Sequence, residues 1–197
     1  MASGVFTSMF FFRFIMLESI KKIRSRKAIS DMEDTAIISK KFRCDYIIAI
    51  GGGSALDAAK AIAVLAVNNM SGMDLFSKKA DAALPVIAIP TTSGTGSEVT
   101  PYSILTVDEW QTKKSFAGDC IYPKIALLDP KYTFSLPIDY TISTAFDAVS
   151  HLFESYFSLK SNEMSKMYSQ EGIRAFAKAI DAIKNRKFDE QSRYYLM

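Results

Sequence analysis

A glycine-rich segment near the end of the first quarter of the chain has residue types suited to phosphate binding. Residues 51–54 read Gly-Gly-Gly-Ser, follow the apolar residues 47–50, and precede a stretch rich in alanine and leucine, residues 55–67. A strand, a glycine turn and a helix in this order leave no Cβ between backbone N–H groups and a ligand, and the helix N-terminus adds a positive dipole end. The pattern differs from both the Walker A and the G-x-G-x-x-G motifs, because no Gly-Lys pair follows and Leu56 stands at the third glycine position.

The same segment also has a purely structural interpretation. Ser54 and Asp57 have the spacing of a capping box, in which Asp57 only fixes the start of the helix. The glycines alone would then form an ordinary tight turn. Both interpretations stay open at this point.

A second candidate turn follows the apolar residues 86–89. Residues 90–98 read Pro-Thr-Thr-Ser-Gly-Thr-Gly-Ser-Glu, with five hydroxyl side chains within the seven residues 91–97. Ser and Thr side chains cap helices, line turns, or bind phosphate and ribose oxygens. Two such turns, each at the carboxyl end of a buried strand, would face one crevice of an open α/β sheet, where ligands bind.

Asp147 and His151 form a candidate half of a metal site. They are four residues apart in a segment with helical apolar spacing, so both side chains project from one helix face. A carboxylate and an imidazole in this arrangement can share one cation. A hydrogen-bonded or solvated pair is the alternative, and His151 is the only histidine of the chain.

The elements that must position these residues follow from the apolar pattern. Short apolar runs separated by glycine-rich or helical pieces predict buried strands of an α/β sheet, at residues 46–50, 84–89, 102–107 and 124–128. A polar helix is expected around residues 30–41. After Pro137 the spacing becomes helical, with one apolar face at Ala145, Ala148, Val149, Leu152 and Phe153 and a later one at Met164, Met167, Tyr168, Phe176, Ile180 and Ile183.

Composition limits the remaining classes. The chain has 197 residues, a net charge of +3 and 49% apolar residues, which excludes a disordered chain and gives no sign of nucleic-acid binding. Cys44 and Cys120 match no metal-ligand or disulfide pattern, which favours a reducing, cytoplasmic setting. The apolar residues 5–17 are short and carry their positive charges on the wrong side for a signal peptide, so a core helix is expected there rather than a membrane segment.

Taken together, the motifs resemble the iron-containing (group III) alcohol dehydrogenase family. The resemblance lies in residues 45–63, 84–106, 122–137 and 141–158. It implies an α/β fold, with an incomplete Rossmann-like dinucleotide-binding domain followed by the start of an all-α metal-binding domain. The related branch of glycerol dehydrogenases and dehydroquinate synthases shares this fold, but residues 90–101 and 146–151 resemble the alcohol dehydrogenase branch.

The resemblance also implies a set of site residues and cofactors. Metal-dependent hydride transfer between a small alcohol or aldehyde and NAD or NADP is the implied activity, with Fe(II) or Zn(II) as the metal. Asp147 and His151 match the first two metal ligands. No catalytic residue is implied beyond the metal ligands, and the reaction needs no protein nucleophile. The implied cofactor-binding residues are Gly52, Gly53, Ser54, Asp57, Thr91, Thr92, Thr95, Lys113 or Lys114, Thr133 and Leu136.

The sequence departs from the family at both ends. We expect an unmatched N-terminal segment at residues 1–41, a partial nucleotide-binding domain at 42–137, and the truncated start of a helical metal-binding domain at 138–197. The family's remaining metal ligands would lie beyond Met197, which predicts little or no activity for this chain alone and exposed apolar faces on its sheet. The alternative is a catalytically inactive nucleotide-binding remnant, or a partner of an intact paralogue; a homo-oligomer is also compatible with the sequence.

Overall fold

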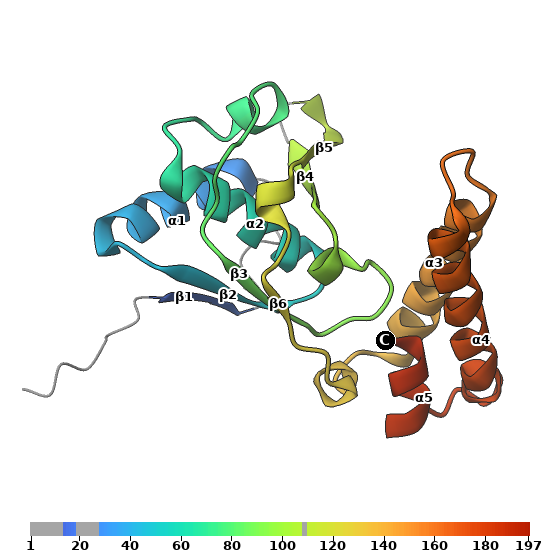
Figure 1. Cartoon of the computed structure of the whole chain (residues 1–197). Coiled ribbons are helices and arrows are strands. Elements are labelled where there is room, and N and C mark those ends of the chain that lie inside the picture. The colour runs from blue at the N-terminus through green and yellow to red at the C-terminus, as the bar shows by residue number, and fades with distance from the viewer. Residues whose placement is uncertain (1–13, 19–27, 108–109) are drawn as a thin grey trace, which may run out of the picture.

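The computed structural model describes residues 14–18, 28–107 and 110–197 of the chain. An α/β part occupies the first two thirds, and a helical part follows it (Figure 1). The strand-to-helix change after Pro137 agrees with the apolar spacing of the sequence. Among the helices that the structure describes, none combines the length and the apolar character that crossing a bilayer requires.

A four-stranded parallel sheet forms the centre of the α/β part. Its strands lie in the order β1, β2, β3 and β6, and they span Phe14–Glu18, Tyr46–Gly51, Val86–Pro90 and Ile125–Ala126. The register pairs Gly51 at the end of β2 with Pro90 at the end of β3. The two glycine-rich segments therefore leave neighbouring strands at the same edge of the sheet.

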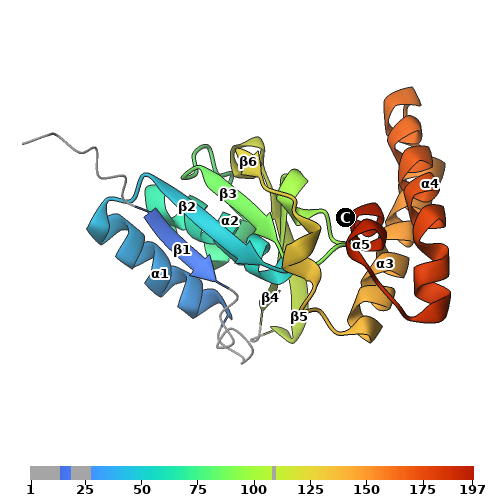
Figure 2. The ribbon, with the colours of Figure 1, turned by 90° about the horizontal axis from the view of Figure 1, so that it is seen from below.

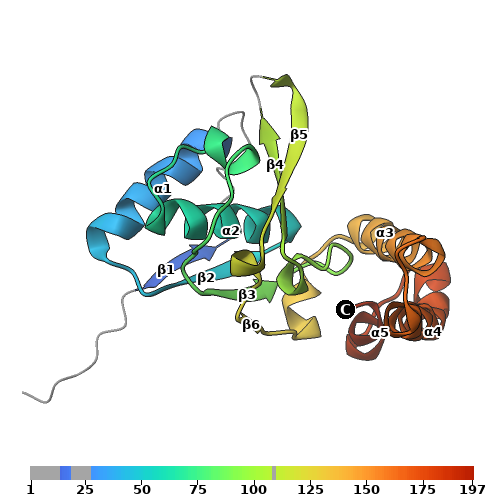
Figure 3. The same ribbon diagram turned by 45° about the horizontal axis from the view of Figure 1, so that its top comes forward.

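Helices α1 and α2 lie together on one face of this sheet (Figure 3). They span Ala28–Phe42 and Gly53–Val67. Burial alternates along β2, where Ile47 and Ala49 are fully buried, while α2 is buried over ten of its fifteen residues. An alanine-rich helix can approach a sheet closely on several sides, so α2 forms the centre of the core.

The strand expected at residues 102–107 does form, but it does not join the parallel sheet. Strand β4, Tyr102–Val107, pairs in antiparallel fashion with β5, Thr112–Ala117. Its burial alternates, with Ser103, Leu105 and Val107 inside and the residues between them exposed. A period of two is typical of a half-buried antiparallel strand, whereas buried parallel strands are apolar throughout. The expectation of a fourth fully buried parallel strand here was wrong.

Three helices make up the C-terminal part, at the right of Figure 2. Helices α3, α4 and α5 span Ile138–Phe157, Glu163–Asn185 and Glu190–Leu196. Asn162 and Asp189 begin α4 and α5 with capping boxes. The described connecting segments include the short 3-10 helices η1 at Met73–Phe76, η2 at Ser97–Val99, η4 at Asp119–Ile121 and η5 at Pro130–Thr133.

The apolar faces predicted for the helical part are only partly buried. Ala145 and Ile183 lie in a small cluster with 1% and 8% exposure. Phe153, Met164 and Tyr168 are largely exposed instead. Helical spacing identified the apolar side of each helix, but three helices provide too few neighbours to cover all of it.

The N-terminal apolar run also differs from its prediction. Residues 14–18 form strand β1, whereas a core helix was expected over residues 5–17. Residues 5–13 lie outside the described part of the chain. An apolar run of this length fits a buried helix or a parallel strand equally well, and pairing with β2 decides for the strand.

The sheet face opposite α1 and α2 is apolar and only half-buried. It carries Ile48 and Ile50 of β2 and Ile87 and Ile89 of β3. Within the described residues no helix lies against this face (Figure 1). This agrees with the expectation of apolar sheet surface that neighbours would cover in a doubly wound fold.

The two faces of β2 predict different sensitivities to truncation. Ile47→Ala removes a side chain with 0% exposure from the core, so we expect the free energy of unfolding to fall by about 2–5 kcal/mol. Ile48→Ala, the matched change on the half-buried face, should be clearly milder. Urea unfolding followed by circular dichroism measures both, and equal losses would contradict this assignment of the core.

Candidate functional site

The two glycine-rich turns meet at the carboxyl edge of the sheet. The Thr91 N–H donates to the Gly51 carbonyl oxygen over 2.9 Å, directly beyond the paired ends of β2 and β3. Gly51 has a φ of 156°, and Gly52 is the extended N-cap residue of α2. The chain thus leaves the strand and enters the helix within a single tight turn, as the glycine pattern predicts.

Glycine is required in the first turn because the second turn packs against it. A Cβ on Gly52 would lie 3.2 Å from Thr92 Oγ1, and one on Gly53 would lie 2.7 Å from Thr95 Oγ1. The threonine side chains therefore occupy the space that side chains at residues 52 and 53 would need. Both turns form one continuous surface that displays hydroxyl groups beside the N-terminus of α2.

The capping box expected for Ser54 and Asp57 is absent. Helix α2 begins at Gly53 without a side-chain cap, and Ser54 is exposed. The Asp57 carboxylate instead accepts a hydrogen bond from Ser97 Oγ at 2.6 Å and one from the Ile104 N–H at 3.1 Å. The capping interpretation of Asp57 was therefore wrong, because these hydrogen-bond donors lie on η2 and β4 rather than at the start of α2. An uncapped N-terminus leaves donors for an anionic ligand.

Lys60 is a buried residue of this region that the sequence analysis did not identify. Its side chain is 0% exposed, and its ammonium donates to Ser97 Oγ at 3.0 Å and to the Tyr102 carbonyl oxygen at 2.6 Å. Thr100 Oγ1 is a third acceptor at 3.4 Å, and Asp57 Oδ1 lies 3.8 Å away. The only sequence signal was a lysine amid the alanines of α2, where every neighbouring position is buried.

Burial and nearby charges act in opposite directions on the pKa of this charged group. Desolvation lowers the pKa of the Lys60 ammonium, while the charges of Asp57 and Glu98 raise it. Burial likewise raises the pKa of the Glu98 carboxyl, against the hydrogen bond from its own backbone and the charge of Lys60. The charges that approach the buried ammonium are thus carboxylates from α2 and η2.

The second turn also contacts the helical part. Gly94 has a φ of +125°, and a Cβ there would lie 2.5 Å from the Thr144 carbonyl oxygen of α3. A cavity of about 340 Å³ lies beside this contact, lined by the turn residues Gly94, Thr95 and Gly96, by Glu98, by His151 and by apolar residues of α3, α4 and the C-terminal segment. The structure therefore brings the predicted metal ligand His151 and the second turn to one cavity.

Asp147 and His151 lie on one face of α3. They are one turn apart, with His151 Nε2 4.0 Å from Asp147 Oδ1, and both side chains are about half exposed. Two ligands bound at about 2.1 Å to a tetrahedral ion are about 3.4 Å apart, so these donors need to approach each other, which rotation of two exposed side chains allows. An imidazole and a carboxylate are ligand types that iron and zinc accept. Within the described residues, no group of three or more His, Cys, Asp and Glu side chains could hold a metal ion.

The remaining predicted residues lie away from the two turns. Lys113 and Lys114 are exposed on β5, and the Lys114 ammonium lies 4.0 Å from the centre of the Trp110 ring. Thr133 is buried in η5, where its carbonyl oxygen accepts a hydrogen bond from Arg193. Leu136 is half-buried three residues further on. None of these four residues lines the cavity beside His151.

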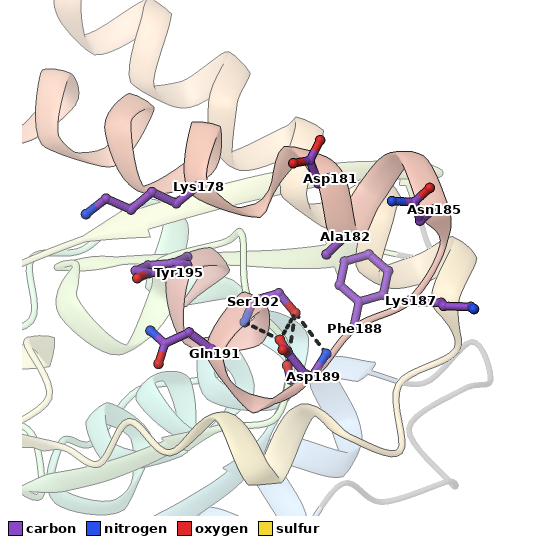
Figure 4. A pocket seen from close by; sticks show the side chains of 10 residues that line it. All are labelled: Lys178, Asp181, Ala182, Asn185, Lys187, Phe188, Asp189, Gln191, Ser192 and Tyr195. Carbon is purple, nitrogen blue, oxygen red and sulfur yellow. Dashed lines mark hydrogen bonds between the residues drawn. The ribbon is translucent and has the colours of Figure 1, made fainter.

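A second hollow, of about 710 Å³, lies between α4 and α5 (Figure 4). It is open to solvent and contains none of the predicted site residues. The hydrogen bonds drawn there join Asp189 and Ser192, which form the capping box of α5. Its polar groups thus serve the helix start, and the candidate site remains at the edge of the sheet.

A parallel sheet with two glycine-rich turns at its carboxyl edge is the arrangement found in α/β proteins of the doubly wound class. Residues 14–130 match the sequence model of a family described as iron-containing alcohol dehydrogenase. The chain belongs to this family. The match begins at residue 14 and so includes part of the segment 1–41 for which the sequence showed no resemblance.

Individual relatives agree with the family match. The chain is 36% identical over 169 residues to long-chain-alcohol dehydrogenase 1 of Geobacillus thermodenitrificans, and 31% identical over 179 residues to the long-chain primary alcohol dehydrogenase AdhA of Thermoanaerobacter ethanolicus. These matches cover 82% and 89% of this chain but 42% and 45% of the relatives. The chain thus spans less than half the length of these relatives.

Solved structures of similar proteins likewise match most of this chain but less than half of their own length. The crystal structure of sulfoacetaldehyde reductase from Bifidobacterium kashiwanohense, in complex with NAD+, matches with a TM-score of 0.78 and 31% identity, over 85% of this chain and 46% of that one. NADH-dependent butanol dehydrogenase A of Thermotoga maritima matches with a TM-score of 0.77 and 30% identity, over 85% and 43%. The fold described above is therefore that of part of a larger family member.

The contact between Gly94 and α3 predicts that alanine substitutions at two glycines of one turn lower the free energy of unfolding by different amounts. Gly94→Ala forces a Cβ against the Thr144 backbone, whereas Gly96→Ala meets nothing within 4 Å, although both glycines have positive φ. We expect Gly96→Ala to lower the free energy of unfolding by about 1–2 kcal/mol through its backbone conformation alone, and Gly94→Ala to lower it further. Thermal unfolding compares the two, and equal melting temperatures would argue against docking of the turn on α3.

Proposed function

We propose that this chain provides the cofactor-binding part and two metal ligands of an alcohol dehydrogenase. The reaction is the interconversion of a small alcohol and its aldehyde, in which NAD+ accepts a hydride and one proton is released. The single observation that carries this proposal is the position of the second turn, which packs against the first turn and lines one cavity with His151, so that cofactor and metal ligand would lie close together. The NAD+ complex of a family relative and the alcohol dehydrogenase names of others support it.

In this proposal the turns bind the dinucleotide. Gly52, Gly53 and Ser54 hold the pyrophosphate at the uncapped start of α2, where backbone N–H groups and the helix dipole favour an anion. The hydroxyl groups of Thr91, Thr92 and Thr95 lie on the adjoining surface and contact the phosphates and the nicotinamide ribose. Asp57 fixes the space between the two turns, since its carboxylate is held by Ser97 and Ile104.

Four further residues are proposed contacts of the cofactor. Thr133 and Leu136 lie in the segment that joins the sheet to α3, and Lys113 and Lys114 lie on the exposed hairpin strand β5. The charge of Lys113 or Lys114 suits an anionic cofactor, and Lys114 would have to leave its contact with the Trp110 ring to bind it. Thr133 is held in place by its contact with Arg193.

Asp147 and His151 would hold the metal ion, for which we propose Fe(II), with Zn(II) as the alternative. When bound, the cation polarises the oxygen of the substrate while the nicotinamide exchanges hydride with the carbon that bears it. Helix α3 keeps the two ligands one turn apart, and His151 lines the cavity beside the second turn. Two ligands are fewer than a closed site needs, so metal binding and turnover of this chain alone should be weak.

A reducing, cytoplasmic location is proposed with this function. Cys44 and Cys120 do not form a disulfide with each other, which supports this proposal. We propose NAD rather than NADP as the cofactor, because the relatives whose names specify a nicotinamide cofactor include NADH-dependent and NAD-dependent dehydrogenases.

Cofactor binding gives the first test of the proposed function. Isothermal titration of the full chain with NAD+ should show binding, and Gly53→Val should weaken it at least about tenfold, because a branched side chain there displaces Thr95. Gly72→Val, whose side chain would meet Ile29 of α1 and lies outside the cavity beside His151, is the matched control and should bind NAD+ like the parent chain. Absence of NAD+ binding by the parent chain would contradict the proposal, and a parallel titration with NADP+ tests the cofactor preference.

Metal binding gives a second test, which is independent of the cofactor. With oxygen excluded, Fe(II) or Zn(II) bound per chain should fall sharply in His151→Ala and in Asp147→Ala, because each removes one of two ligands. Ser150→Ala, on the exposed side of the same helix, should leave metal content unchanged. NADH formation from a short-chain alcohol is measured on the same samples. NAD+ binding that is indifferent to metal, with no turnover, would instead indicate a chain that only binds nucleotide.

A further inference from the structure

The buried ammonium of Lys60 connects three elements of the candidate site. It extends from the middle of α2 and donates to Ser97 of η2 and to the Tyr102 carbonyl oxygen at the start of β4. Thr100, between these two elements, accepts at 3.4 Å. A lysine on a helix usually keeps its charge in water and is buried only when its ammonium is paired. The complete burial of Lys60 therefore depends on the oxygen atoms that accept hydrogen bonds from it.

The surroundings of this ammonium supply oxygen atoms rather than an aliphatic pocket. Hydroxyl, carbonyl and carboxylate oxygens approach it from separate directions, and the nearest carboxylate, Asp57, lies 3.8 Å away. A buried charge is tolerated only when it is paired and hydrogen-bonded, so each of these groups is held where the ammonium needs it. Lys60 thereby fixes the backbone of residues 97–102 relative to α2.

The position of Ser97 makes this connection relevant to the second turn. Residues 91–96 leave β3 at the Thr91–Gly51 hydrogen bond and end at Ser97. Ser97 Oγ both accepts from Lys60 and donates to Asp57, so the downstream end of the turn is tied to α2 by two bonds. The turn is thus held at both ends, and Thr95 is kept against Gly53 between them.

We propose that Lys60 is a positioning residue for the cofactor: through Ser97 it holds the second glycine-rich turn against the N-terminus of α2, so that both turns contact one dinucleotide. The proposal rests on the proposed function, since it concerns the same site. Lys60 itself is fully buried, so it acts on the dinucleotide through Ser97 rather than by direct contact. Its effect is on affinity for the dinucleotide, through the position of residues 91–97.

Ser97 and Ser103 provide a matched pair of variants. Both side chains are buried, at 5% and 0% exposure, and both donate to Asp57. Ser97 joins the turn to the Lys60 ammonium, whereas Ser103 Oγ donates to the Asp57 carbonyl oxygen from β4 and has no bond to the turn. Ser97→Ala therefore breaks the proposed connection, and Ser103→Ala removes a comparable buried hydroxyl without breaking it.

The experiment uses the full chain and two readouts. Hydrogen exchange without any ligand measures the protection of residues 91–97, and isothermal titration measures the dissociation constant for NAD+. Lys60→Met and Ser97→Ala should each raise exchange in residues 91–97 and weaken NAD+ binding by at least about tenfold. Ser103→Ala should leave both within about twofold of the parent chain, because the turn keeps its connection.

Ser97→Ala keeps the charge of Lys60 and decides the question if Lys60→Met does not fold. Folded variants that bind NAD+ like the parent chain, or that show unchanged exchange at residues 91–97, would overturn the positioning role. Equal effects of Ser97→Ala and Ser103→Ala would also overturn it, because general destabilisation would then explain both. If the parent chain binds no NAD+, the proposed function fails, and the exchange measurement still shows separately whether Lys60 holds the turn.

Discussion

The pairing of Gly51 with Pro90 at the ends of two parallel strands is the constraint on which the rest of the site depends. It places the starts of both glycine-rich turns side by side, and the hydrogen bond from Thr91 to Gly51 continues the pairing into the turns themselves. Because the turns share one surface, glycines are needed at residues 52 and 53 to make room for threonine side chains. The proposed site for an extended, doubly anionic ligand therefore depends on strand register.

Two contacts extend this local arrangement to the rest of the chain. Lys60 ties the end of the second turn to the centre of the core, and Gly94 lets the same turn approach the backbone of α3. Helix α3 carries His151 into the cavity beside the turn. The position of His151, the proposed metal ligand, relative to the proposed nucleotide-binding edge is thus set by one turn that touches the core and the helical part together.

The sequence predicted those parts of the site that depend on local pattern. Glycines after an apolar run predicted the first turn, and helical spacing placed Asp147 and His151 on one helix, because both signals lie within a few residues. The partners of Asp57 and the burial of Lys60 could not be predicted in the same way. Their contacts lie about forty residues further along the chain, and local spacing favoured a capping box for the first and solvent for the second. The same reason explains why the hairpin strand β4 was assigned to the parallel sheet.

The most direct test of the account is the footprint of NAD+ on the full chain by hydrogen exchange. If the two turns form one dinucleotide site, NAD+ protects residues 51–57 and residues 91–97 together, at the same ligand concentration and in proportion. Protection of one turn without the other would contradict the shared site, and protection of neither turn would contradict nucleotide binding by this chain.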